Sequence, residues 1–177
     1  ITSLGLIRNK RSKLDLIAPL VGIPGIVVAG IAAVENADFG SVSVSLLRVL
    51  VGTAFLGAVS DTMLLGHWYL VQPGMPRRLI NELVDAVIYI WPLEVVVLLL
   101  PTGMISVING TIDDGWNGVL GWFWLASAIV TGVLAFVTRA ALKERSYSAV
   151  MAATGLMYLA ILTAFCTDIV ARALLAI

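Results

Sequence analysis

Long apolar runs separated by short polar connections dominate the chain. Five of these runs reach membrane-spanning length, with approximate bounds at residues 14–34, 46–71, 79–100, 118–138 and 147–175. About 20 helical residues cross the ~30 Å hydrocarbon layer of a bilayer. Because lipid offers the backbone no hydrogen-bond partner, each run is predicted to be an α-helix. The pattern therefore predicts an all-α integral membrane protein, a bundle of five transmembrane helices.

The connections between the runs leave no room for a soluble domain. The longest connection spans residues 101–117 and is expected to hold at most a short surface element. We therefore expect a single polytopic membrane domain over residues 1–177.

Composition supports the same class of protein. Hydrophobic residues make up 60% of the chain and charged residues only 12%, against about 25% charged residues in soluble domains. A net charge of zero argues against nucleic acid as a partner, because phosphate binding needs a concentrated basic face. The single cysteine, Cys166, excludes an intramolecular disulfide and a cysteine-rich metal site. The lipid bilayer is the expected environment.

The few charges are distributed unevenly, and this predicts an orientation. Nine of the eleven Lys and Arg residues would share one side of a five-span membrane protein: Arg8, Lys10, Arg11, Lys13, Arg77, Arg78, Arg139, Lys143 and Arg145. The opposite connections carry Glu35, Asp38, Asp113 and Asp114. By the positive-inside rule the N-terminus is predicted to be cytoplasmic and the C-terminus outside. A bacterial inner (plasma) membrane is the expected location.

Ionisable residues within the second and third runs are candidates for function. Asp61 falls near the middle of the second run, where a carboxylate is costly and needs a partner. His67, the only histidine, follows in the same run. In the third run Glu82, Asp85 and Tyr89 recur at intervals of three and four, which places them on one helical face.

The short turn between these runs predicts that they pack antiparallel. Counting residues from the turn places His67 at the depth of Glu82 and Asp61 at the depth of Tyr89. One hypothesis is a cluster of protonatable groups that relays protons or binds the carbonyls of a quinone, whose ring lies against Trp68 or Tyr69.

A structural interpretation of the same residues stays open. Trp68 and Tyr69 then belong to the aromatic belt at the membrane interface, and Glu82 lies among the headgroups. Asp61 and Asp85 would be buried and would bind hydroxyl groups or a neighbouring subunit.

Two further sets of polar residues have local explanations. Asp168 and Arg172 are spaced i, i+4 with the acid first, which is the favourable order for an ion pair within a helix. Glu94 follows the Trp91–Pro92 pair, where a structural role at a helix kink is expected.

Cofactor motifs are scarce. One histidine cannot supply bis-histidine ligation, so heme is not expected, and no metal site is predicted. Phosphate loops, zinc helices and nucleophile elbows are absent from the sequence. A bound quinone is the one cofactor that the candidate residues suggest.

Three functions fit these observations. The first is an accessory subunit of a larger membrane complex, with other membrane subunits as partners, in a respiratory or photosynthetic electron-transfer assembly that handles quinones or protons. The second is a small proton- or ion-coupled transporter that acts as a homo-oligomer. The third is a lipid-modifying enzyme with His67 and Glu82 as acid and base; the isolated chain is otherwise expected not to be an enzyme.

Overall fold

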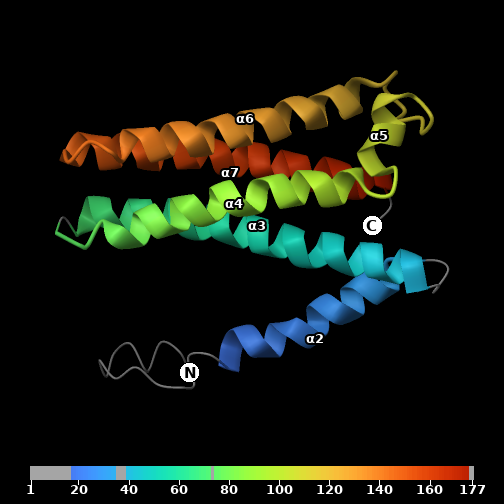
Figure 1. Cartoon of the computed structure of the whole chain (residues 1–177), viewed down its shortest axis with the longest axis horizontal. Coiled ribbons are helices and arrows are strands. Elements are labelled where there is room, and N and C mark those ends of the chain that lie inside the picture. Colours follow the sequence, from blue (N-terminus) through green and yellow to red (C-terminus); the bar gives the residue numbers. More distant parts are fainter. Residues whose placement is uncertain (1–16, 35–38, 73, 176–177) are drawn as a thin grey trace. The chain divides into compact units, whose positions relative to one another are not determined.

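The computed structural model describes residues 17–34, 39–72 and 74–175, and every regular element in this part of the chain is a helix (Figure 1). The helices are α2 (Ile17–Ala32), α3 (Phe39–Val71), α4 (Arg78–Leu99), α5 (Gly103–Ile108), α6 (Val119–Ala141) and α7 (Tyr147–Leu175). The expected basic residues at positions 8, 10, 11 and 13, the acidic residues at 35 and 38, and the start of the first run at 14–16 lie outside the described residues.

Among the described residues, α3, α6 and α7 are long and apolar enough to cross a membrane. Helix α4 has 22 residues and also carries Glu82, Asp85 and Glu94, whereas α2 has only 16 residues. Helix α3 begins at Phe39, seven residues before the expected bound, and its first turns contain serines with bonded hydroxyl groups. Ser43 Oγ, for example, donates a hydrogen bond to the Phe39 carbonyl at 2.6 Å.

The chain divides into two compact units, and the boundary falls inside α3. The first unit covers residues 1–49 and contains α2 and the beginning of α3. Within it, Ser45 Oγ donates to the Gly30 carbonyl at 2.7 Å. A Cβ atom on Gly30 would lie 2.7 Å from Leu46 Cδ2, so the missing side chain allows these two helices to approach closely.

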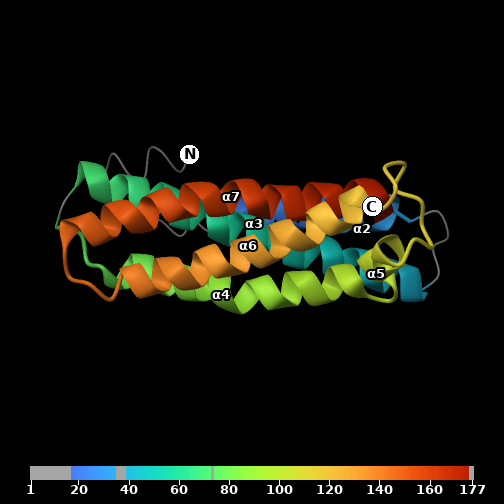
Figure 2. The same cartoon turned by 90° about the horizontal axis from the view of Figure 1, so that it is seen from above.

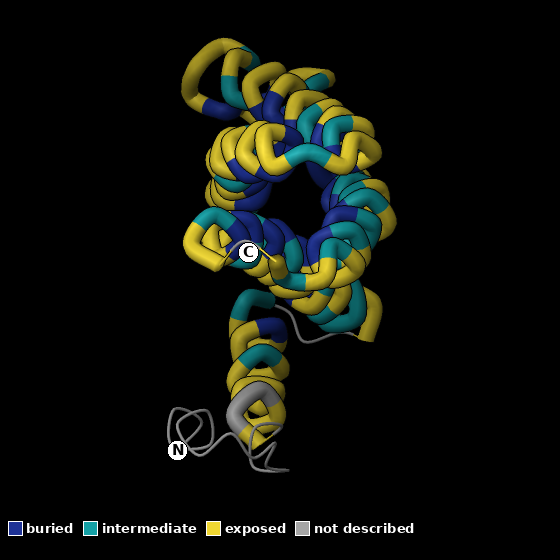
Figure 3. Tube along the Cα trace, turned by 90° about the vertical axis from the view of Figure 1, so that its left-hand side faces the viewer, coloured by how far each residue is buried: buried dark blue, intermediate teal, exposed yellow. Residues whose placement is uncertain are grey.

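The second unit covers residues 50–177 and is a bundle of α4, α6, α7 and the rest of α3. Figure 3 shows that the buried positions of these helices face the interior of the bundle. Helix α6 packs against both α4 and α7, and Figure 2 shows it crossing obliquely between them. The middle of the core is formed by side chains from all four helices: Phe55, Val59, Val87, Ala135, Met157, Ala160 and Ala164.

The short helix α5 closes the end of the bundle that carries the connection between α4 and α6. Its Met104 and Val107 are fully buried in a cluster with Leu98, Trp124 and Ala171. The expected surface element is therefore packed into the core of the second unit, because two of its six residues are apolar side chains that the cluster encloses.

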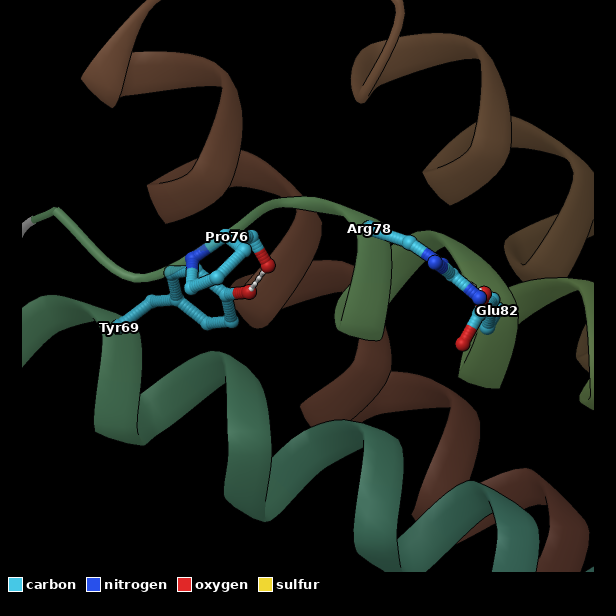
Figure 4. A network of polar contacts seen from close by, with 4 residues as sticks. All are labelled: Tyr69, Pro76, Arg78 and Glu82. Atoms are coloured by element: carbon cyan, nitrogen blue, oxygen red, sulfur yellow. Dashed lines mark hydrogen bonds and ion pairs between the residues drawn. The ribbon is translucent and has the colours of Figure 1, made fainter.

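The opposite end of the bundle brings the two basic connections together. Arg77 Nη1 donates to the Glu144 carbonyl at 2.7 Å, and its other terminal nitrogen donates to the Ser146 carbonyl. Tyr69 closes the same connection by donating to the Pro76 carbonyl (Figure 4). The connections that follow α3 and α6 thus lie at one end of the second unit, as an alternating threading of the chain requires.

Asp114 organises the loop that leads into α6. Its Oδ1 accepts the backbone N–H groups of Trp116 at 2.9 Å and Gly118 at 2.8 Å, and its Oδ2 accepts the N–H of Leu120 at 2.8 Å. These groups lie at or near the start of the helix, where N–H groups have no partner within the helix. Burial acts to raise the pKa of Asp114, but the accepted N–H groups outweigh it, and the pKa of this carboxyl lies below its ordinary value.

A lowered pKa sets the sign of the pH dependence of this loop. The carboxylate stabilises the loop fully above the ordinary aspartate pKa of about 3.9, and this stabilisation is lost as the pH falls through the lower value of the folded state. We expect Asp114→Asn to accelerate hydrogen exchange at Leu120 already at neutral pH, because the amide nitrogen that replaces Oδ2 cannot accept its N–H. Hydrogen exchange measured against pH checks this.

Asp113 provides the matched control. Only its Oδ1 is used, by the N–H of Gly115 at 2.9 Å, so Asp113→Asn keeps an acceptor in place and should leave the exchange of Leu120 unchanged. Equal protection of Leu120 in the wild type and in Asp114→Asn at neutral pH would contradict the capping role.

Candidate functional site

Three ionisable side chains from two helices meet inside the second unit. Glu94 of α4 is fully buried, and Asp168 of α7 is 4% exposed. One turn further along α7, Arg172 Nε donates to Asp168 Oδ2 at 2.7 Å. We call Glu94, Asp168 and Arg172 the buried charge cluster.

Gly52 of α3 leaves the space that the buried charge cluster fills. A Cβ atom at this position would lie 2.6 Å from Arg172 Nη2, 2.8 Å from Asp168 Oδ1 and 3.5 Å from Glu94 Oε1. All three polar groups therefore converge on the backbone of α3 at one point. Any larger residue at position 52 would displace at least the guanidinium or the Asp168 carboxyl.

The polar atoms of the cluster are only partly satisfied. Within the described part of the chain, both carboxyl oxygens of Glu94 and Oδ1 of Asp168 are buried without a hydrogen-bond donor. Buried polar atoms are nearly always hydrogen-bonded in proteins, and a buried carboxylate without a donor is strongly unfavourable. Such atoms indicate either a bound species or a proton at this place.

The sequence contains the members of the cluster but no signal for their meeting. The i, i+4 spacing within one helix predicts the Asp168–Arg172 pair, and the structure contains it. Glu94 lies on another helix, and its approach to Asp168 depends on how α4 and α7 are rotated against each other. A charged residue in the C-terminal half of an apolar run is the only sequence signal that could have identified it.

Asp61 lies on the surface of the second unit. Its side chain is exposed, and together with Leu64, Leu65, Trp68 and Leu83 it lines a shallow depression of about 350 Å³. Asp61 makes no hydrogen bond or ion pair with another described residue. The structure thus places a carboxyl group on an otherwise apolar face of α3.

The side chains of His67, Trp68 and Tyr69 lie in three different environments. His67 Nδ1 lies 3.4 Å from the hydroxyl of Tyr158 on α7, and the two rings meet edge to face with centroids 6.5 Å apart. Trp68 is exposed and donates from Nε1 to Gln72 Oε1 at 3.0 Å. Tyr69 is buried in the core, so of the two expected interfacial aromatics only Trp68 lies on the surface.

The candidates on α4 are held by arginines or left exposed. Glu82 accepts Arg78 Nε at 2.5 Å in an exposed pair (Figure 4). Asp85 accepts Arg139 Nε of α6 at 2.6 Å, in a pair whose side chains are about one third exposed. Tyr89 is 74% exposed.

The predicted cluster of Asp61, His67, Glu82, Asp85 and Tyr89 is therefore spread over separate contacts. His67 contacts a residue of α7, Asp85 is paired with a residue of α6, and Glu82 is paired with a residue of its own helix, α4. A quinone or proton role for these residues stays a prediction. The described residues also contain no group of three His, Cys, Asp or Glu side chains arranged to hold a metal ion.

Comparisons with known proteins supply no identity. No family model, no curated protein and no solved structure matches the chain.

Proposed function

We propose that the chain is an integral membrane protein of five spans, with its N-terminus in the cytoplasm, that acts as a non-catalytic subunit of a larger membrane complex. Three helices suited to crossing a membrane support the membrane part of this proposal. The two basic connections at one end of the bundle support the orientation through the positive-inside rule. Helices α2 and α4 would supply the remaining two spans.

The exposed carboxyl group of Asp61 carries the proposal of a partner. Asp61 lies ten residues before the end of α3 at Val71, which is about 15 Å along the helix axis. In a membrane this position is within the hydrocarbon layer, where a charged side chain costs about 2.5–3.5 kcal/mol or more when it faces lipid. Ionisable residues at such depth almost always face protein or a water-filled cavity.

The chemistry around Asp61 defines the partner. Leucines and Trp68 line the shallow depression, which suits an apolar helix, and the carboxyl group calls for a cation or hydrogen-bond donor at the same depth. We therefore assign this face to a transmembrane helix of another protein that carries Arg or Lys near its middle.

A second copy of this chain fits the face poorly. Within the described helices, Arg48 is the basic residue most distant from a helix end, and it is buried. Arg172 lies in the last turn of α7 and is paired with the buried Asp168. Two copies that met through this face would place two Asp61 carboxyl groups close together, which is unfavourable unless a proton is shared.

Asp61→Asn is expected to weaken the complex. Removing one member of a charge pair that is buried at an interface costs about 2–5 kcal/mol, and 2 kcal/mol already corresponds to a roughly thirtyfold loss of affinity. The measurement is purification of the full chain in mild detergent from its native membrane, with every co-purifying subunit identified. A photo-crosslinking residue at Leu64, which is 58% exposed beside Asp61, shows which subunit contacts this face.

The expected result is one crosslinked subunit with a basic residue at matching depth, bound less tightly by Asp61→Asn. Glu82→Gln is the matched control, because Glu82 is exposed and already paired with Arg78, and it should leave the complex intact. An Asp61→Asn protein that retains the same subunits, or a wild-type chain that purifies and crosslinks only to itself, would refute the proposal.

The identity of the complex is tested by the same purification. An electron-transfer assembly predicts redox subunits and bound quinone among the purified components. The lipid-modifying alternative requires His67 and Glu82 to act together, whereas the structure gives them different contacts, with Tyr158 and Arg78. The unsatisfied carboxyl oxygens of the buried charge cluster indicate a separate binding site for a proton or a small cation inside the bundle.

A further inference from the structure

The charges of the buried cluster do not balance. Two carboxyl groups, Glu94 and Asp168, face one guanidinium, Arg172. If both carboxyl groups were ionised, the interior of the bundle would hold one uncompensated negative charge, at a cost of several kcal/mol. The cluster therefore needs one additional positive charge.

The unsatisfied atoms show where that charge belongs. Asp168 uses only Oδ2 for Arg172, and its Oδ1 points to the same place beside Gly52 as Glu94 Oε1. Both oxygens lie within 3.5 Å of the same point, the position of a Cβ atom at Gly52. If one carboxyl group carries a proton, it becomes a hydrogen-bond donor, and the unsatisfied oxygen of the other carboxyl group accepts that bond.

We propose that Glu94 and Asp168 form a buried proton-binding site, in which the protonated Glu94 carboxyl donates to Asp168 Oδ1 while Arg172 binds Asp168 Oδ2. Arg172 thus holds the Asp168 carboxyl through its Oδ2, and Glu94 is the group that gains or releases the proton. The site is independent of the Asp61 face, and its test does not need a partner protein.

A proton fits the site better than a metal ion. A metal ion would have only two carboxylates as charged ligands, and the guanidinium of Arg172 would repel it from the same point. The described residues also include no third acidic, histidine or cysteine side chain grouped with this pair.

The ionisable residues of the described elements around the cluster are few and have interaction partners. Helix α5 contains no ionisable residue, and the only one in α6, Arg139, is paired with Asp85. On α3 the contact is Gly52, and Arg48, one turn earlier on that helix, is buried and has an interaction partner.

Infrared spectroscopy of the full chain in lipid nanodiscs tests the site directly. A protonated carboxyl group has a C=O stretching band that is separate from the carboxylate bands and shifts in heavy water. At neutral pH the wild type should show this band, and labelling glutamate with ¹³C should shift it. Glu94→Gln should remove it, whereas the exposed control Glu82→Gln should not.

Protein stability supplies the second measurement. Glutamine resembles the protonated carboxyl in shape and can donate to Asp168 Oδ1, so Glu94→Gln should unfold at the same temperature as the wild type, with or without sodium. Absence of the band at neutral pH, or a band that neither the ¹³C label nor Glu94→Gln changes, would overturn the proposal. A sodium-dependent rise in the unfolding temperature that disappears in Glu94→Gln would also overturn it, because the species would then be a metal cation.

Discussion

Replacing Arg172 with methionine is expected to lower the free energy of unfolding by about 3 kcal/mol. Removing one partner of a buried ion pair costs about 3–5 kcal/mol, because the other charge stays buried without compensation. The lower end applies here, because the Arg172 side chain is 27% exposed while that of Asp168 is only 6% exposed. Unfolding of the purified chain by heat or denaturant, in the same lipid or detergent, measures the change.

A second arginine provides the control for this substitution. Arg78 has the same i, i+4 spacing to its partner Glu82, but their side chains are 84% and 54% exposed. Arg78→Met should therefore leave the free energy of unfolding nearly unchanged. If Arg78→Met and Arg172→Met were equally destabilising, burial of the Asp168–Arg172 pair inside the bundle would not contribute to the cost of breaking it, and the prediction would be wrong.

Replacing Gly132 with leucine is expected to destabilise the bundle by a similar amount, about 3 kcal/mol. A Cβ atom at Gly132 would lie 2.6 Å from Cζ2 of the Trp91 indole, so leucine must displace the ring. Inserting side-chain atoms into a packed core costs typically about 1–3 kcal/mol. The displaced ring also loses the hydrogen bond from Trp91 Nε1 to the Ala128 carbonyl, which is 2.8 Å long and worth about 1 kcal/mol.

Gly57→Leu is the matched control. Gly57 lies within α3, is exposed, and has no neighbouring atom within 4 Å of the position of a Cβ atom. Leucine also has the higher helix propensity, so this variant should be as stable as the wild type or slightly more stable. Thermal unfolding of the two variants side by side decides the matter, and equal stability of Gly132→Leu and the wild type would refute the close contact.

The helices themselves follow from the sequence to within a few residues. The last apolar run was expected at residues 147–175, where α7 lies, and the third at 79–100, where α4 covers Arg78–Leu99. Among the described helices, the largest difference is at the start of α3, which begins seven residues before the expected bound. The length of an apolar helix can be predicted from the sequence, because the contribution of each residue to partitioning into lipid depends little on how the helices pack against one another.

The candidate site was less predictable, and the reason is geometric. Depth along a helix follows from counting residues, but the face that a residue presents depends on how the helix is rotated in the bundle. Asp61 and Tyr89 were expected at one depth on facing helices, yet both are exposed. Glu94 was expected to have a local role at a kink, yet it is fully buried beside Asp168 and Arg172.

By itself the sequence determined the all-helical class, the apolar helices and the local pair of Asp168 with Arg172, because each depends on neighbouring residues in the chain. Only the tertiary structure decided that Glu94 completes a buried cluster beside Gly52 and that Asp61 remains on the surface. Both outcomes depend on which helix faces pack together, and that choice is made by the fit of side chains such as Trp91 against Gly132 between helices distant in sequence.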